Sequence, residues 1–230
     1  MDSRTSRPPT RPASRPPGRQ PRRPDRSPFK LPRVSSRTGV YLEVGAKRVF
    51  ASAADWPGWA RGAKNEKEAL QALAAYAPRY ARVVKLPKDA ADFEVVERQK
   101  GNASTDFGVP AIVARAESKK LTARETERLI SLLEACWKYL DQVRAKVPQE
   151  LRKGPRGGGR DRDKMYAHVL EAELAYASAL RVRLKEPDRK ALLAALRKPN
   201  PDAKWPVAYA IRRIAWHALD HAWEMEDRVP

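Results

Sequence analysis

Three histidines are the residues whose type and spacing could do chemistry in this 230-residue chain, which contains no others. His217 and His221 are four residues apart, so on a helix both imidazoles lie on one face, one turn from each other. Each ring could bind the same ion through a nitrogen about 2.0–2.1 Å away, and His168 on another helix would supply a third ligand. The alternative, three unrelated histidines, is less favourable because burying imidazoles without partners is costly. We therefore predict a divalent metal site on His168, His217 and His221.

Three neutral imidazole ligands leave at least one coordination position open, as catalytic zinc sites do and closed structural sites do not. An ion in such a site lowers the pKa of water or a thiol and creates a nucleophile at neutral pH. Imidazole is an ordinary ligand of Zn, Ni, Co and Fe, so these residues do not choose among the four metals. The pattern favours a metal-dependent enzyme that acts on a small-molecule substrate.

Carboxylates near the histidine pair offer further roles. Glu224 falls on the helical face of His217 and His221 and could be a fourth ligand or a catalytic general base. Asp220 and Glu171 could accept hydrogen bonds from imidazole N–H groups and so orient the rings. For each carboxylate the alternative is a place on a solvated helix face.

A glycine- and arginine-rich segment, residues 151–161, precedes the stretch that carries His168. Consecutive glycines allow backbone N–H groups to turn toward an anion, and the following helix adds a positive N-terminus. We expect Arg156, Gly158 and Arg160 to hold the anionic part of a substrate or thiol cofactor. The alternative is a flexible connector between two helices, and the segment lacks the Gly-Lys-Ser/Thr ending of a P-loop.

The elements that must position these residues are helices in the second half of the chain. A capping box at Thr122 begins a helix that ends before Pro148, with apolar residues on one face. Further helices are predicted over residues 161–184, 187–197 and 206–227, with Pro187 and Pro206 at their first positions. Four amphipathic helices over residues 119–230 predict a four-helix bundle.

The preceding segment, residues 40–98, predicts a small α/β domain, so the expected fold class is α+β. Strands are expected over residues 41–44, 48–51, 59–63 and 93–98, with a type II turn at Pro57-Gly58 and a helix capped by Asn65. Tyr41, Trp56 and Trp59 either pack against that helix or form an exposed binding surface. Residues 99–118 show no clear period and are predicted to be a linker.

Two parts of the chain resemble known families. The series Asp55-Trp56-Pro57-Gly58-Trp59, with Arg61-Gly62 and Glu66-Lys67-Glu68-Ala69-Leu70 after it, resembles the N-terminal domain of HicB-like proteins. HicB antitoxins usually continue into a DNA-binding module and pair with a small toxin. No helix-turn-helix or ribbon-helix pattern follows here.

The second resemblance is carried by Tyr166-Ala167-His168 with the acidic stretch after it, and by Trp216-His217-Ala218-Leu219-Asp220-His221. This half is similar to the DinB-like superfamily of metal-binding four-helix bundles, and the resemblance implies that the three histidines are the ligands. Some relatives, the thiol-dependent maleylpyruvate isomerases and thiol S-transferases, use the ion to activate a low-molecular-weight thiol. The resemblance therefore implies a thiol-dependent transferase, isomerase or hydrolase.

Charge suggests a different class of function. The net charge is +19, and residues 1–39 hold ten arginines and one lysine against two aspartates. This proline-rich stretch has too little apolar surface to fold, so we expect a disordered basic tail. The alternative function is a non-catalytic binding or regulatory protein whose tail and HicB-like domain engage nucleic acid or a protein partner.

Composition excludes other classes. No stretch approaches the roughly 20 apolar residues of a membrane-spanning helix, so we expect no membrane partner. The arginine-rich start lacks the apolar segment of a secretory signal, and the single cysteine, Cys136, cannot form an internal disulfide. We expect a cytoplasmic protein, for which the sequence leaves open a homodimer. Cys136 lies on an apolar helix face, where a thiol is usually inert.

Overall fold

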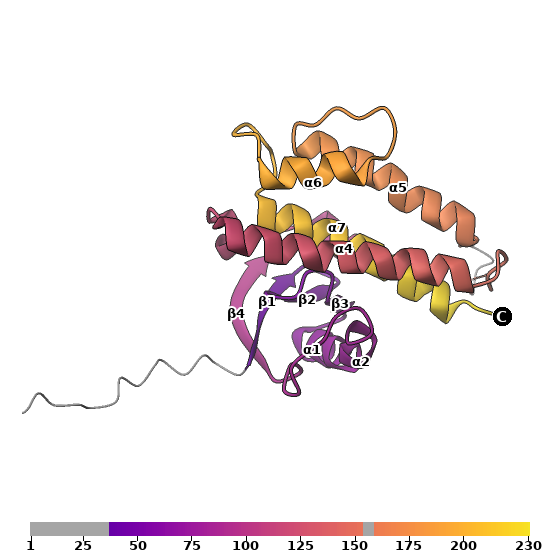
Figure 1. Ribbon diagram of the computed structural model, residues 1–230. Helices are drawn as coiled ribbons and strands as arrows, with labels where there is room; N and C mark the ends of the chain where they lie inside the picture. Colours follow the sequence, from indigo (N-terminus) through magenta and orange to yellow (C-terminus); the bar gives the residue numbers. More distant parts are fainter. Residues whose placement is uncertain (1–36, 154–158) are drawn as a thin grey trace, which may run out of the picture. The chain divides into compact units, whose positions relative to one another are not determined.

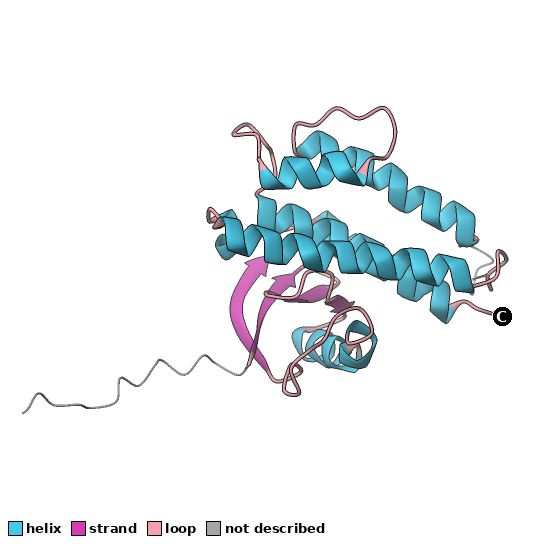
Figure 2. Ribbon diagram, viewed as in Figure 1, coloured by secondary structure: helices cyan, strands magenta, loops and turns pink. Residues whose placement is uncertain are grey.

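The computed structural model describes residues 37–153 and 159–230, which fold into a mixed α+β structure. Within these residues there are one four-stranded sheet and seven α-helices (Figures 1 and 2). The strands are β1 (Thr38–Val44), β2 (Val49–Ala53), β3 (Ala60–Ala63) and β4 (Phe93–Lys100). The helices are α1 (Glu66–Ala75), α2 (Ala77–Tyr80), α3 (Ala103–Phe107), α4 (Ala123–Lys146), α5 (Arg162–Ala179), α6 (Arg189–Arg197) and α7 (Val207–Asp227), with a 3₁₀ turn, η1, at Arg115–Ser118. The predicted α+β class is confirmed.

The sheet has the strand order β3-β2-β1-β4. Strands β1 and β2 form the predicted antiparallel hairpin, with Leu42 opposite Ala51, and β3 continues it antiparallel to β2. Strand β4 pairs with β1 in parallel, a connection that needs a long crossover, and α1 and α2 lie in that crossover. The four predicted strands are therefore present, and β1 begins at Thr38, two residues before the predicted start of the domain.

The predicted turn after β2 is also present, and it lies against the helices. Trp59 N donates to the carbonyl of Trp56, and Gly58 has a φ of +92°, as the third position of a type II turn requires. A Cβ built on Gly58 would lie 2.8 Å from Leu219 Cδ1 and 3.2 Å from the Ala215 carbonyl. Glycine is needed here both for its backbone conformation and because α7 approaches so closely.

Both faces of the central strands are covered. On one face the indole of Trp59 donates to the Leu73 carbonyl of α1 at 2.9 Å. On the other, Phe50 packs edge to face with Trp216 of α7, with ring centroids 6.2 Å apart. Trp59 and Tyr41 are buried, so these two aromatics pack in the interior and do not form an exposed surface. Every residue of β2 is buried, as expected for a strand between two layers.

Helices α4 to α7 occupy the segment in which four helices were predicted. The capping box at Thr122 is formed, with Glu125 N donating to Thr122 Oγ1 at 3.2 Å, and α4 ends before Pro148. Two predicted starts are corrected: Asp188, not Pro187, caps α6, and Pro206 is the cap residue of α7. Both prolines thus lie one or two positions outside the helix, which is within the usual spread of helix boundaries.

The helix predicted over residues 161–184 is shorter than expected, because α5 ends at Ala179. Arg181 adopts a left-handed backbone with φ +63°, and Val182 N donates back to the Ala177 carbonyl at 2.9 Å. This is the hydrogen-bond pattern that commonly terminates helices, but here it uses an arginine where a glycine is usual.

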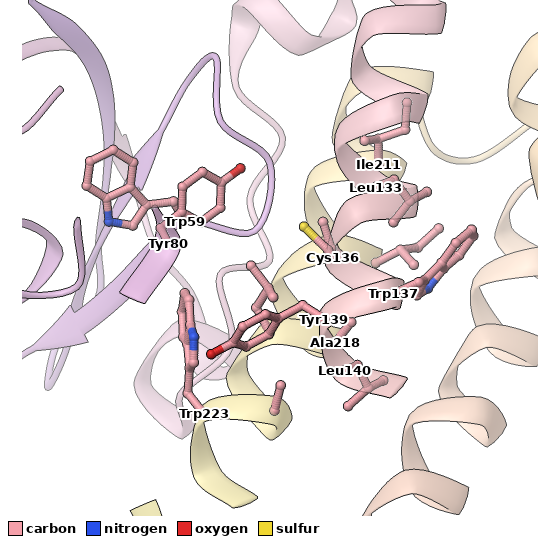
Figure 3. Packing of buried hydrophobic residues seen from close by; sticks show 14 of the residues in the cluster. Trp59, Tyr80, Leu133, Cys136, Trp137, Tyr139, Leu140, Ile211, Ala218 and Trp223 are labelled. Atoms are coloured by element: carbon pink, nitrogen blue, oxygen red, sulfur yellow. The ribbon is translucent and has the colours of Figure 1, made fainter. Parts of the chain in front are cut away.

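Helix α7 lies at the centre of these elements. It contacts the sheet through Trp216, packs along α4, and contacts α5 on a further side. In Figure 1, α5 and α6 lie across the α4–α7 pair from the sheet. Figure 3 shows side chains of one core cluster, among them Cys136 and Leu140 of α4, Ala218 and Trp223 of α7, and Trp59 and Tyr80 from the first half of the chain. Because α7 is covered on several sides, 13 of its residues are buried, among them the polar residues Arg212 and His217.

The segment predicted to be a linker, residues 99–118, contains α3 and η1 and is bound to the folded unit. Glu43 of β1 is buried and accepts from Ala111 N at 3.1 Å and Ile112 N at 3.0 Å. Glu117 of η1 is ion-paired with Arg212 of α7, and both side chains are about 5% exposed. Residues 37–153 and 159–230 accordingly belong to one compact unit, with sheet and helix residues in a shared core.

No helix in the described ranges is long and apolar enough to span a bilayer. The basic tail predicted over residues 1–39 lies outside the described residues as far as residue 36.

Candidate metal centre

The three histidines come together where α5 faces α7. His168 projects from the second turn of α5, and His217 and His221 lie one turn apart in the C-terminal half of α7. One ligand atom from each ring can be chosen so that all three lie within 4.8 Å of one another. The ring centroids of His168 are 5.1 Å from those of both His217 and His221. These residues could hold a metal ion.

The two histidines of α7 already face each other with the atoms that ligation needs. His217 Nε2 and His221 Nε2 are 3.1 Å apart. Two nitrogens bound tetrahedrally at about 2.0–2.1 Å from one ion lie about 3.4 Å from each other, so little adjustment is required. His217 is 7% exposed, and His221 has a side-chain exposure of 13%. The pair is therefore mostly shielded from solvent, while His168 lies at the half-buried rim.

Glu224 fixes the orientation of one ring. Its Oε2 lies 3.0 Å from His221 Nδ1, and its Oε1 accepts from Arg228 Nη1 at 2.9 Å. A carboxylate at Nδ1 favours the tautomer with the proton on that nitrogen, which leaves the Nε2 lone pair free toward His217. The hydrogen bond from His221, followed by that from Arg228, keeps the pKa of Glu224 below its ordinary value. Glu224 thus lies behind the ring, on the side opposite His217.

The surroundings keep two imidazoles neutral. Burial, reinforced by the charges of His221 and Arg213, lowers the pKa of His217 to about 2. Burial and then the charge of Arg160 lower the pKa of His168 below its ordinary value. A neutral imidazole is the form that binds metals, so both side chains are in the ligating state at pH 7.

His217 Nδ1 is buried, and no described residue offers it a hydrogen-bond partner. If His217 ligated through Nε2, as its position suggests, this nitrogen would carry the proton. The ring is held instead by aromatic neighbours: Tyr176 of α5 lies 5.9 Å away and Trp216 6.0 Å away, centroid to centroid. These contacts fix the ring by packing.

The remaining predicted site residues are placed differently. Asp220 does not reach an imidazole, because its Oδ1 accepts from Arg61 Nη1 at 2.8 Å, on the sheet side of α7. Glu171 is exposed and acts on His168 through its charge. Arg160 is exposed just before α5, and its charge reaches His168 and His217. Arg156 and Gly158 lie outside the described residues.

Sequence reasoning missed two residues beside the histidines, Arg213 and Tyr176. Arg213 lies four residues before His217. This is the spacing that identified the histidine pair, so helical periodicity could have predicted that Arg213 lies beside His217. Tyr176 is eight residues beyond His168 on α5. The sequence does not show which face of α5 packs against α7, because that depends on tertiary packing, and so it does not place Tyr176 beside His217.

Comparison with known proteins gave no match: no family model matches the chain, and no curated protein or solved structure is similar enough to match.

Proposed function

We propose that this protein is a metal-dependent enzyme that holds one divalent ion on His168, His217 and His221 and acts on a small molecule. The observation that carries the proposal is the convergence of three imidazoles from two helices, with ligand atoms within 4.8 Å. The ion would be Zn, Ni, Co or Fe, all of which accept imidazole ligands. The resemblance of residues 118–230 to DinB-like bundles supports the same ligand set and adds a low-molecular-weight thiol as a co-reactant.

The residues present fit such an ion. The donors are neutral nitrogens, and a carboxylate sets the tautomer of one ring, an arrangement that recurs at histidine-ligated metals. Three protein ligands are the number found at catalytic zinc sites, where a further position serves water or substrate. A bound ion would supply Lewis-acid chemistry, lowering the pKa of a thiol or water at that position.

The residues of the chain contribute positioning and charge. Glu224 holds the proton on His221 Nδ1, and Arg228 holds Glu224 in place. Tyr176 and Trp216 cover His217 and limit the access of water to that side of the site. Arg160 adds positive charge near His168, which favours the approach of an anionic thiol or substrate.

The first experiment is elemental analysis of the purified protein after dialysis. We expect about one divalent ion per chain, and we expect His217→Ala to lose it while its circular dichroism spectrum stays unchanged. Glu171→Gln is the matched control, because Glu171 is close to His168 in sequence but exposed; this variant should keep the ion. Unaltered metal content in His217→Ala would refute the ligand assignment.

A second measurement separates an enzyme from a binding protein with a structural ion. Thermal unfolding is recorded for metal-loaded and metal-free protein with candidate thiols. A thiol that binds the open position raises the midpoint only when the ion is present, because ligand binding to the folded state stabilises it. If no thiol or small molecule shifts the loaded protein, the ion is structural and the proposed activity falls.

A further inference from the structure

Among the buried and half-buried arginines of the described residues, Arg213 is the one that forms no ion pair with a carboxylate. Seven described arginines are buried or half-buried, and six of these pair with carboxylates: Arg61, Arg79, Arg162, Arg189, Arg212 and Arg228. Arg213, which is half-buried, forms neither an ion pair nor a hydrogen bond within the described part of the chain, and its Nη1 is buried without an acceptor. Each of the other six buried or half-buried guanidinium groups therefore pairs with a carboxylate, and that of Arg213 does not.

The unpaired guanidinium lies beside the metal centre. Arg213 is one turn before His217 on α7, and residues four apart on a helix have Cβ atoms about 5–6 Å from each other. Its guanidinium carbon lies 4.6 Å from the ring centroid of Trp216 and 5.4 Å from that of Tyr176. The same two rings flank His217. Arg213 and His217 therefore share one wall of the site.

The contacts with Trp216 and Tyr176 position the side chain of Arg213 but offer no hydrogen-bond acceptor to its N–H groups. A guanidinium over an aromatic face is attracted to the ring, but its N–H donors lie in the guanidinium plane and still need acceptors. A buried donor without a partner destabilises the folded protein, because it has lost its hydrogen bonds to water and gained none. A bound anion would remove this cost, and the planar fork of two N–H groups matches a carboxylate in particular.

We propose that Arg213 binds the carboxylate group of a small-molecule substrate, next to the three-histidine centre. The proposal rests on the proposed function for its description of the ligand as a substrate, but carboxylate binding itself can be measured without a metal. Tyr176 and Trp216 form the sides of this subsite, and Arg213 anchors the substrate while its reacting group extends one helical turn toward His217. Arg213 is thus a residue that determines specificity for anionic substrates.

The test uses acetate as the probe and the metal-free full chain, so that no ion can bind the acetate. Acetate is exchanged for chloride at constant ionic strength, and ¹H–¹⁵N spectra follow the Nε–H of arginines and the indole N–H of tryptophans. Arg213→Lys and Trp216→Phe identify the two resonances by their loss. We expect a saturable shift of the Arg213 and Trp216 signals.

Arg189 is the internal control, because it is half-buried like Arg213 but already pairs with Glu173 and Asp141. Its signal should not move. In Arg213→Gln the acetate affinity reported by Trp216 should fall at least tenfold, and Arg213→Lys should retain part of it, since lysine keeps the charge and loses the fork. A shift that does not saturate, or equal binding by Arg213→Gln, overturns the proposal.

Phosphate at the same ionic strength tests the class of anion. A saturable response to phosphate without one to acetate would overturn the assignment of a carboxylate. Metal content is measured separately, on protein of the same preparation that has not been stripped of metal. Metal binding without acetate binding defeats the subsite alone, whereas acetate binding without metal binding defeats the proposed function and leaves the subsite standing.

Discussion

Glu224 is the acidic residue on which the metal affinity should depend most, although it does not face the space between the histidines. Replacing it with glutamine keeps its size but removes the charge that holds the Nδ1 proton of His221. Partners of this kind typically contribute 10- to 100-fold in metal affinity. We therefore expect Glu224→Gln to bind the ion 10- to 100-fold more weakly, as measured by competition with a coloured chelator.

The control for this change is again Glu171→Gln, which removes a carboxylate of the same type from the exposed face of α5. It should leave the affinity within about twofold of the original, because screened surface charges contribute little. If Glu224→Gln binds as tightly as the control, Glu224 does not orient His221.

The depressed pKa of His217 gives the metal-free protein a defined pH dependence. The unfolded chain takes up a proton on this residue below its ordinary pKa of 6.5, and the folded chain does not until about pH 2. Stability is therefore lost as pH falls below 6.5, by about 1.4 kcal/mol for each pH unit. Urea unfolding at pH 7.5 and 5.5 should show a loss of about 1–2 kcal/mol.

His217→Gln identifies the source of this effect. Carboxylates with lowered pKa values contribute only at more acidic pH, so the loss of stability between pH 7.5 and 5.5 comes from His217 and His168, whose pKa values are lowered. We expect the variant to lose less stability over this range than the original protein. An equal loss in both proteins would mean that His217 is solvated in the folded state.

For individual residues, the sequence predicted relative positions correctly where these depend only on spacing along a helix. The separation of His217 and His221 predicted that they share a helix face, because helical periodicity is local. The prediction that Asp220 could accept from an imidazole N–H is not met, because the residue points to the sheet side of α7, where Arg61 binds it. Which partner a polar side chain meets depends on neighbours distant in sequence, such as the 159 positions between these two.

Among the elements, the turn between β2 and β3 determines how closely the sheet can approach α7. Gly58→Ala would combine an unfavourable positive φ with a methyl group 2.8 Å from Leu219. Backbone strain and overpacking each cost about 1–3 kcal/mol. We expect a destabilisation of about 2–5 kcal/mol in urea unfolding, with weaker metal binding because α7 carries two of the proposed ligands.

Gly108→Ala separates strain from steric conflict. Gly108 also has a positive φ, +119°, but the nearest atom to its added Cβ would be the guanidinium of exposed Arg48, at 3.5 Å. This variant should lose stability through strain and keep its metal affinity. Equal effects on metal affinity in both variants would contradict a specific link between the turn and α7.

The elements that the sequence predicted well have strong local signals. Asn65 caps α1, Thr122 caps α4, and the hairpin strands carry the expected residues. The end of α5 was missed because Arg181 is an unusual residue for a left-handed position. The parallel pairing of β4 with β1 could not be predicted from periodicity, since alternation along a strand does not identify its neighbour.

For the whole chain, the basic tail and the histidine centre should be independent. Deleting residues 1–33 removes most of the positive charge of the tail. We expect this deletion to abolish salt-sensitive binding to nucleic acid, because such binding depends on released counterions, and to leave metal content unchanged. Filter binding at several salt concentrations measures the first effect. Binding that survives deletion, or that is absent from the full chain, contradicts a role for the tail.

The sequence did not predict the buried polar contacts that join the sheet to the helices in the described residues. Glu43 and Glu117 each bind distant segments, and neither residue stands out in a sequence, since a glutamate in an alternating strand or a short turn is usually solvated. Their burial follows from the approach of residues 99–118 to β1 and α7. Such pairs depend on tertiary structure and carry no local pattern.

The enclosed position of α7 has a consequence for the timescale on which the centre can open. The middle of a helix that is covered by the sheet, α4 and α5 cannot unfold locally without exposing buried surface. Its amides should therefore exchange with deuterium only when the whole unit unfolds. His217 and His221 would then leave the site only when the whole unit unfolds, whereas His168, at the rim, could move away without global unfolding. Entry and exit of a ligand would accordingly be governed by fluctuations of α5.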